Sequence, residues 1–306
     1  MVANEGTYRE MTVEIREIPL VGPDTGPYGI TVGPDGALWL TLVQAGGIAR
    51  LGPDGDVRTY PLEPAGGRPL IITTGSDGAL WFTRSGDDRI GRLAVDGEQR
   101  TIVLPAGTGP GGIAAGPDGA LWYAGMTSDT IGRVDTDGTV TGFPLPVTGG
   151  FASMITAGAD DALWFTLNRA NAIGRIDLAG RVTLHPLPTP DAGPVGITLD
   201  ADGSVWFVEI AAGQLGRIDP DGRIVEFPLP DRAARPHAIV ADPAGGAWFT
   251  EWGANRIGHL DPAGRIESYD LPTPGAEPHG IARTPDGVWA ALEVGAVAHL
   301  TPNPTA

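Results

Sequence analysis

A tryptophan recurs along the chain every 41 or 42 residues, and this period constrains the fold more than any other feature. Each of these tryptophans ends a copy of one short motif, which reads GPDGALW at Gly33–Trp39 and again at Gly116–Trp122. Seven of the eight tryptophans belong to the repeat: Trp39, Trp81, Trp122, Trp164, Trp206, Trp248 and Trp289. A period of roughly 40–45 residues is typical of a β-propeller, in which each unit forms one blade. The spacing therefore predicts seven blades.

Each repeat unit divides into four short segments that turn residues separate. An isoleucine lies eight or nine residues before the tryptophan, and a segment such as Ile131–Arg133 (IGR) follows it in most units. Asp-Gly pairs between the segments supply the positive φ that tight hairpin turns require. We therefore expect four antiparallel strands in each blade.

The two ends of the chain are expected to complete one blade together. The segment Ile15–Leu20 matches the fourth segment of the other units, yet it precedes the first full unit. The last unit stops at Leu300, after its third segment. The sequence thus predicts an all-β, seven-bladed β-propeller with four-stranded blades over residues 1–306, a single domain in which the N-terminal strand closes the last blade. Such closure leaves only short sheet edges.

Composition excludes several classes of protein. The 306 residues include 47 Gly and 29 Pro, but 42% of the chain is hydrophobic, so a core is present and these residues are interpreted as turns. The lack of cysteine excludes disulfides and thiolate sites. A net charge of −17 disfavours binding to nucleic acid or to anionic membranes. Because no apolar run marks a signal peptide or a membrane span, we expect a cytoplasmic protein.

Positions that break the repeat point to function, because the fold alone does not require them. Two residues before the repeated isoleucine, where the innermost strand begins, the seven units read Tyr28, Leu70, Gly111, Ser153, Val195, His237 and His279. We expect the residue twelve after the isoleucine to lie on the same face, where the units read Leu42, Arg84, Gly125, Leu167, Glu209, Glu251 and Glu293. Titratable residues therefore gather in the last blades and in the first, their neighbour in a closed ring.

Two histidines and two carboxylates are the strongest candidates in this sector. His237 and His279 occupy equivalent positions in adjacent blades, whereas the other three histidines fall on outer or third strands and are assigned to structure. Glu277, two residues before His279, and Glu293 suit a hard divalent cation. Mg²⁺ is such a cation, since it binds through one or two carboxylates and keeps waters for substrate oxygens.

Four further residues belong to the sector, and three of them are open to two interpretations. Trp252, the one tryptophan outside the repeat, is expected to form an apolar wall for a ligand beside Glu251. Glu209 and Glu251 could face the channel mouth or be solvated or hydrogen-bonded loop carboxylates. Tyr28 could bind a ligand or pack at the entrance of the first blade.

The last two units carry the most distinctive segments. They read EWGANRIG at Glu251–Gly258, PTP at Pro272–Pro274 and EPHGI at Glu277–Ile281. These segments resemble the virginiamycin B lyase (streptogramin B lyase) family, and through the repeats the resemblance covers essentially the whole chain. The last unit departs from the pattern, because it is one residue shorter before Trp289 and VGAVAHL follows Glu293 where the repeat has a polar turn and IGR.

The resemblance implies an activity and a set of roles. It implies a Mg²⁺-dependent carbon–oxygen lyase that linearises type B streptogramins, which are cyclic depsipeptide antibiotics, by eliminative cleavage of the lactone ester, and so gives resistance. It implies that Glu277 and Glu293 bind the metal and that His279 is the general base. His237 matches the histidine of the family that contacts the substrate, and Tyr28 falls where the family has a tyrosine at the rim.

Two other functions stay open on the sequence. Gluconolactonase-type propellers hydrolyse lactones with a divalent metal, but are expected to draw their metal ligands from several blades rather than one. A non-catalytic propeller could present the same face to a ligand. Motifs of other enzymes, such as GxSxG, a P-loop or HExxH, are missing. A closed ring needs no partner, so a monomer is expected.

Overall fold

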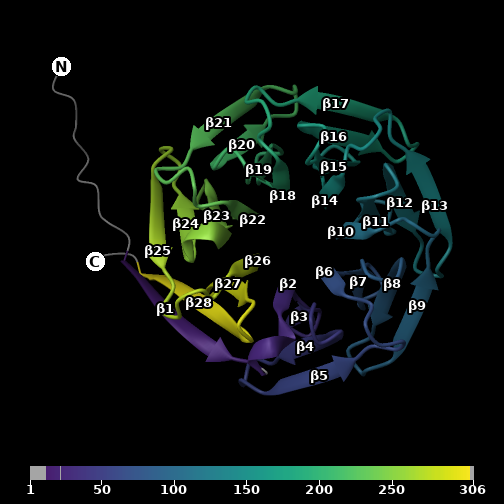
Figure 1. Ribbon diagram of the computed structural model, residues 1–306, viewed down its shortest axis with the longest axis horizontal. Coiled ribbons are helices and arrows are strands. Elements are labelled where there is room, and N and C mark those ends of the chain that lie inside the picture. The colour runs from purple at the N-terminus through teal and green to yellow at the C-terminus, as the bar shows by residue number, and fades with distance from the viewer. Residues whose placement is uncertain (1–11, 21, 304–306) are drawn as a thin grey trace.

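The computed structural model describes residues 12–20 and 22–303, which form a closed ring of seven four-stranded antiparallel sheets (Figure 1). Two short 3₁₀ helices, η1 (Pro23–Thr25) and η2 (Trp252–Ala254), lie between strands. No helix in this described part is long and apolar enough to cross a membrane. The prediction of an all-β, seven-bladed propeller is confirmed.

Within each blade the strands follow one another from the channel outward. The innermost strands are β2 (Pro27–Val32), β6 (Pro69–Thr74), β10 (Pro110–Ala115), β14 (Ala152–Ala157), β18 (Pro194–Leu199), β22 (Pro236–Ala241) and β26 (Pro278–Thr284). The second strands, which carry the repeated tryptophans, are β3 (Leu38–Leu42), β7 (Leu80–Arg84), β11 (Leu121–Gly125), β15 (Ala162–Leu167), β19 (Val205–Glu209), β23 (Ala247–Glu251) and β27 (Gly287–Leu292). Blades 1 to 7 are numbered in this order.

The two outer positions complete each sheet. The third strands are β4 (Gly47–Leu51), β8 (Arg89–Leu93), β12 (Thr130–Val134), β16 (Ala172–Asp177), β20 (Gln214–Ile218), β24 (Arg256–Leu260) and β28 (Ala296–Asn303). The outermost strands are β5 (Val57–Pro61), β9 (Gln99–Val103), β13 (Val140–Pro144), β17 (Val182–Pro186), β21 (Ile224–Pro228), β25 (Ile266–Asp270) and β1 (Thr12–Pro19).

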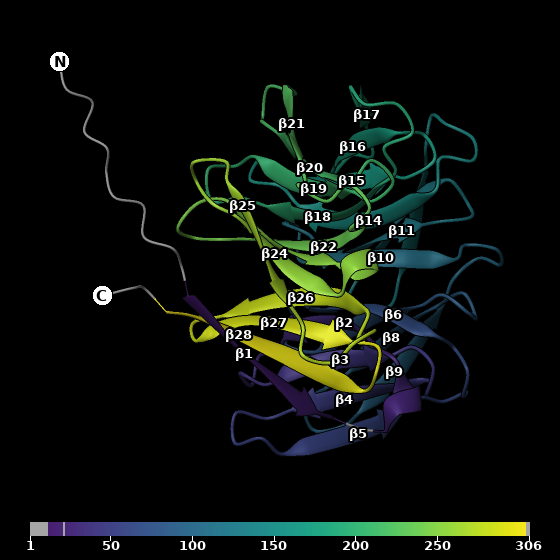
Figure 2. The ribbon, with the colours of Figure 1, turned by 60° about the vertical axis from the view of Figure 1, so that its left-hand side comes forward.

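Strand β1 closes the ring, as the sequence predicted. It pairs antiparallel with β28, from Thr12 opposite Asn303 to Pro19 opposite Ala296, and so becomes the outer strand of blade 7 (Figure 2). The observed strand begins three residues before the expected Ile15 and ends one before Leu20. The first and last strands of the described chain thus share one sheet.

A polar cluster repeated at one end of the sheets holds each blade together. In blade 3, Asp118 in the turn between the first two strands accepts a hydrogen bond from the buried Trp122 indole at 3.1 Å and one from Arg133 at 2.7 Å. Although burial acts to raise it, these hydrogen bonds hold the pKa of Asp118 below its usual value. The same arrangement recurs at Trp39–Asp35–Arg50, Trp81–Asp77–Arg92 and Trp164–Asp160–Arg175. We call this end of the ring the far face.

The three histidines assigned to structure do lie outside the channel mouth. His259 replaces the repeated arginine of blade 6 and contacts Asp242 at 3.1 Å. His299 stacks on Trp289 in blade 7, with ring centroids 3.9 Å apart. His185 lies on the outer strand β17 and stacks on the tryptophan of its own blade. Their contacts account for them without a catalytic role.

Candidate active site

Three rings meet where the innermost strands of blades 6, 7 and 1 begin. Tyr28, His237 and His279 are each the second residue of their strand, and these strands are neighbours around the channel (Figure 1). The Tyr28 hydroxyl lies 3.1 Å from His237 Nε2. The His279 ring centroid lies 4.3 Å from that of Tyr28 and 5.0 Å from that of His237. The structure therefore brings together the three ring residues that the repeat singled out. We call this end of the ring, opposite the far face, the rim.

Small side chains and a bridging threonine bring these strands close. A Cβ on Gly280, next to His279, would lie only 2.4 Å from the Tyr28 carbonyl oxygen, so blades 7 and 1 need glycine to approach. Thr250 on β23 accepts a hydrogen bond from the Ala238 backbone N–H and donates one to the His279 carbonyl oxygen, both at 2.9 Å. The backbone of His279 is thus held by the neighbouring blade.

Two carboxylates surround His279. Its Nε2 lies 2.8 Å from Glu293 Oε2, and one ligand atom from each of Glu277, His279 and Glu293 lies within 4.8 Å of the others. Gln44 donates a hydrogen bond to Glu293 at 2.6 Å, and the Trp252 indole donates a long one to Glu277 at 3.4 Å. All three potential ligands belong to blade 7.

This donor set fits a divalent cation. Two carboxylates and one imidazole converge from a single blade, Glu277 is exposed to solvent and Glu293 is half-buried. Oxygen-rich sites with few protein ligands suit hard cations, which complete their shell with water or substrate oxygens. The structure therefore supports a possible Glu/His/Glu metal site, and its geometry does not distinguish one hard cation from another.

Burial keeps both histidines neutral near pH 7. It lowers the pKa of His279 to about 4, although Glu277 opposes the shift, and it lowers the pKa of His237 to about 3 with a smaller effect from His279. Burial, supported by Glu293 and opposed by Arg68, raises the pKa of Tyr28 to about 12. A neutral imidazole can accept a proton, and a protonated phenol can donate a hydrogen bond.

Trp252 joins this group, as expected. It begins η2, directly after β23, and its ring centroid lies 6.2 Å from that of His279. The Arg235 guanidinium also lies over this indole ring, 5.6 Å from its centroid. Trp252 is half-buried, so part of its apolar surface remains open beside the histidine.

The prediction that Glu251 faces the channel mouth is wrong. The side chain is 1% exposed and its carboxylate accepts hydrogen bonds from Arg256 at 2.6 Å and Ser268 at 2.8 Å, both on the outer strands of blade 6. Glu209 is equally buried in blade 5, where Gln214 donates to it at 2.6 Å. Last residues of second strands point into the sheet packing rather than the channel, which the repeat alone did not reveal.

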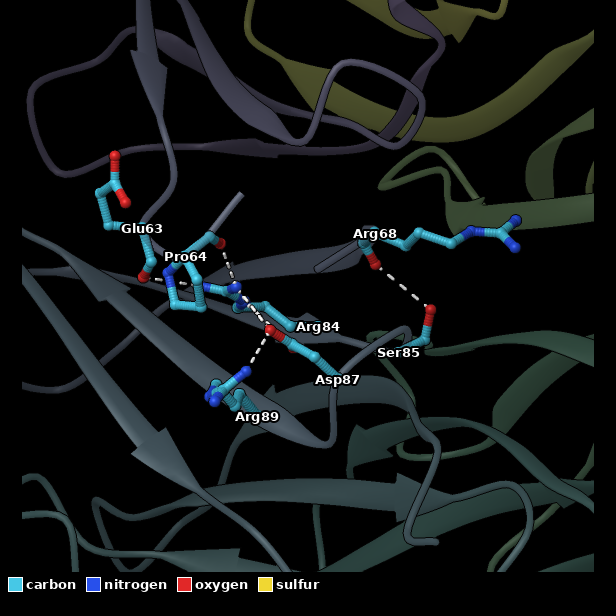
Figure 3. Close-up of polar contacts among 7 residues, drawn as sticks. All are labelled: Glu63, Pro64, Arg68, Arg84, Ser85, Asp87 and Arg89. Atoms are coloured by element: carbon cyan, nitrogen blue, oxygen red, sulfur yellow. Dashed lines mark hydrogen bonds and ion pairs between the residues drawn. The ribbon is translucent and has the colours of Figure 1, made fainter. Parts of the chain in front are cut away.

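The strand end of blade 2 shows what this position does for the fold (Figure 3). Arg84 ends β7 as Glu251 ends β23, and it is also 1% exposed. Its guanidinium donates hydrogen bonds to the carbonyl oxygens of Glu63 at 3.0 Å and Pro64 at 2.6 Å, and to the carboxylate of Asp87 at 2.6 Å. Buried strand-end side chains therefore anchor loops and neighbouring strands.

Glu293 reaches the rim because blade 7 is one residue shorter. Pro278 pairs with Leu292, whereas in blade 6 Pro236 pairs with Glu251. Leu292 is therefore the true counterpart of Glu251, and the alignment that set Glu293 beside Glu251 is off by one. Glu293 follows the strand, as Trp252 does in blade 6, and this shift places its carboxylate beside His279.

Gln44 is a residue that the sequence reasoning missed. It lies 249 positions from Glu293 along the chain, in the loop between β3 and β4 of blade 1. No repeat or local motif signals this contact. The closure of the ring, which makes blade 1 the neighbour of blade 7, is the one signal that could have directed attention to this loop.

Comparison with known proteins agrees with this geometry. The profile of the virginiamycin B lyase family matches residues 13–300. The chain belongs to the virginiamycin B lyase family. The predicted family is thus confirmed, and with it, at the level of the family, a carbon–oxygen lyase that linearises streptogramin B antibiotics.

Solved structures of family members superpose over nearly the whole chain. A virginiamycin B lyase from Staphylococcus aureus is 43% identical, with a TM-score of 0.93 over 95% of this chain and 99% of that one. A catalytically inactive histidine-to-alanine variant of the Staphylococcus aureus enzyme with quinupristin, 42% identical, matches over the same shares with a TM-score of 0.93. A virginiamycin B lyase from Saccharopolyspora erythraea is 62% identical over 55 residues, which is 18% of each chain.

Proposed function

We propose that this protein linearises type B streptogramins by eliminative cleavage of their lactone ester, and that the cluster around His279 carries the reaction. The observation that supports this most directly is a buried imidazole with a lowered pKa, which contacts the Glu293 carboxylate and lies within 4.8 Å of a ligand atom of Glu277. The family and the structure of its Staphylococcus aureus member with quinupristin indicate the substrate class. All the residues involved come from one chain, so a monomer suffices as the active unit.

The elimination requires a base more than a nucleophile. A weakly acidic C–H bond next to a carbonyl loses its proton, the electron pair forms a carbon–carbon double bond, and the C–O bond at the β carbon breaks to release a carboxylate. No water is consumed, so the product keeps the mass of the substrate. We assign removal of this proton to neutral His279, and general base catalysis of this kind typically contributes about 10²–10⁴-fold.

The carboxylates of Glu277 and Glu293 would hold the metal, which we propose to be Mg²⁺. When bound, a divalent cation stabilises negative charge that develops on the substrate carbonyl oxygen. Gln44 holds Glu293 through its 2.6 Å hydrogen bond, and Trp252 contacts Glu277, so both carboxylates have partners that orient them.

His237, Tyr28 and Trp252 are proposed to orient the depsipeptide. The Tyr28 hydroxyl, protonated at all ordinary pH values, can donate to His237 Nε2 and fix its orientation. Trp252 offers an apolar ring surface beside His279. Aromatic surfaces of this kind bury ligand area at little entropic cost. Glu251 has no part in the proposal because its carboxylate is buried within blade 6.

The test is to incubate the purified protein with quinupristin and Mg²⁺, with and without EDTA, and to weigh the product. A linear product of unchanged mass that contains a carbon–carbon double bond and is lost on chelation supports the proposal. A gain of one water would replace it with the metal-dependent lactone hydrolase. An unchanged antibiotic that still binds the protein would favour a non-catalytic binding propeller.

A further inference from the structure

One backbone position in every blade has a left-handed conformation at the rim. It is the residue immediately before the innermost strand, with φ between +46° and +64°. The seven equivalent residues are Gly26, Arg68, Gly109, Phe151, Gly193, Arg235 and Glu277. Glycine adopts this conformation freely, whereas other residues are strained there.

Glycine in three blades shows that the fold does not need a side chain at this position. Where the chain carries one, either local packing or a ligand has to account for it. Phe151 is half-buried, and the Arg169 guanidinium lies 4.9 Å from its ring centroid, so local packing explains it. Glu277 is explained by the proposed metal site. Arg235 packs on Trp252, which itself lies beside His279, and neither its guanidinium nor that of Arg68 has a charge partner among the described residues.

These two arginines are exposed and lack charge partners. The protein carries 37 acidic residues against 20 arginines and no lysine, so most arginines find a carboxylate. Neither Arg68 nor Arg235 forms an ion pair with any residue that the structure describes. In Figure 3 the Arg68 side chain extends away from the buried cluster of Arg84, and only its carbonyl oxygen is engaged, by the Ser85 hydroxyl at 3.2 Å.

Arg68 and Arg235 flank the reacting residues. Arg235 precedes the innermost strand of blade 6 and covers Trp252, and Arg68 precedes that of blade 2, on the other side of Tyr28. The positive charge of Arg68 acts on the Tyr28 hydroxyl, against the effect of burial. In the ring, blades 7 and 1 lie between these two cations (Figure 1).

We propose that Arg68 and Arg235 bind the depsipeptide on both sides of His279, and that their positive charge stabilises the carboxylate that the elimination releases. The inference rests on the proposed function. Breaking the C–O bond leaves an electron pair and a negative charge on the carboxyl oxygen, and a protein of net charge −17 otherwise repels that anion. Arginine binds carboxylates through paired N–H donors, and lysine cannot reproduce that geometry.

The test replaces each arginine by glycine and separately by lysine. Because glycine suits the left-handed backbone, R68G and R235G are expected to melt no lower than the native protein. At the same time kcat/KM for quinupristin should fall about tenfold for each, which corresponds to loss of one charge-assisted contact. Inhibition by the purified linear product should weaken by a similar factor. The lysine variants should recover part of the lost kcat/KM and part of the lost product inhibition.

Asp161→Gly is the matched control. Asp161 has φ +52° in a turn on the far face where blades 1, 2, 3, 5 and 6 carry glycine, so it tests relief of strain away from the rim. Its melting temperature should rise or stay level, with kcat/KM unchanged. If the native protein is active and R68G and R235G keep kcat/KM and product inhibition within twofold, the inference is wrong. An inactive native protein would overturn the proposed function itself.

Discussion

The far face of blade 3 and the rim of blade 7 both carry polar residues, but they differ in whether the blade supplies hydrogen-bond partners for them. Asp118 accepts hydrogen bonds from Trp122 and Arg133, and the cluster recurs around the ring. At the rim, the buried Nδ1 of His279 has no hydrogen-bond partner among the described residues. Satisfied polar clusters stabilise a fold, whereas an unsatisfied buried group is an unusual cost that a ligand can offset. The contrast assigns the far face to stability and the rim to chemistry.

The same contrast separates two glutamates that the repeat aligned. Glu251 is buried, paired with Arg256 and hydrogen-bonded to Ser268. Glu293, displaced by one residue, contacts His279 and accepts from Gln44. A shift of one position along a strand end thus separates a carboxylate buried within its blade from one that contacts His279 at the rim.

The largest effect is expected from His279→Ala. Loss of the base should lower kcat by about 10²–10⁴-fold while the propeller stays folded. Steady-state kinetics with quinupristin and a thermal melt of the same preparation check this. His185→Ala is the control, since His185 also stacks on an aromatic ring but lies on an outer strand. If the His279 variant kept activity within tenfold of the native enzyme, His279 would not be the general base.

Substitution of Glu293 should impair metal-dependent activity, whereas substitution of Glu251 should impair stability. Glu293→Gln should require at least about tenfold more Mg²⁺ for half-maximal activity, with the melting temperature nearly unchanged. Glu251→Gln should lower the free energy of unfolding by about 3 kcal/mol, because it breaks a buried ion pair, while activity per folded molecule persists. Magnesium titrations and denaturant unfolding separate the two. The same defect in both variants would contradict the distinction between a structural Glu251 and a metal-binding Glu293.

The sequence predicted the seven-bladed propeller and the grouping of Tyr28, His237 and His279, and the reason is physical. Strand alternation and turn residues repeat with the blade, so Trp39 and its six counterparts mark the fold, and His237 and His279 stand out as exceptions. Glu293 was assigned to the wrong register because the sequence shows the one-residue deletion before Trp289, but not that the strand consequently ends at Leu292 instead of Glu293. Gln44 could not be predicted, since its contact depends on how the ring closes.

The strand-end carboxylates differ in a way that pH can reveal. Gln214 occupies in blade 5 the place that Arg256 has in blade 6, so Glu209 lacks a cation, and burial raises its pKa from 4.5 to about 7. Because the folded state then binds the proton more tightly, the stability that Glu209 contributes falls as pH rises from 4.5 to 7. Glu209→Gln should therefore stabilise the protein at pH 8 by on the order of 3 kcal/mol, since each pKa unit is worth ~1.4 kcal/mol.

Unfolding curves at pH 5 and pH 8 test this. The gain should shrink toward zero at pH 5, where native Glu209 is already protonated. Glu251→Gln, measured in parallel, should destabilise at both pH values. A Glu209 variant that is less stable than the native protein at pH 8 would mean that its carboxylate is ionised and bound by a group other than Gln214.

The smallest effect is expected on the far face, from Asp118→Asn. The amide keeps an oxygen for the Trp122 indole but loses the ionic part of the contact with Arg133, which is partly exposed and worth about 0.5–1 kcal/mol. Because the folded pKa of Asp118 lies below its unfolded value of 3.8, this stability is present above pH 4 and disappears as pH falls further. Native and variant unfolding curves should therefore differ at pH 7 and converge at low pH, with kcat/KM at pH 7 unchanged. A loss of turnover without a loss of stability would mean that the far face affects the rim through the sheet. The separation between a structural far face and a catalytic rim would then be wrong.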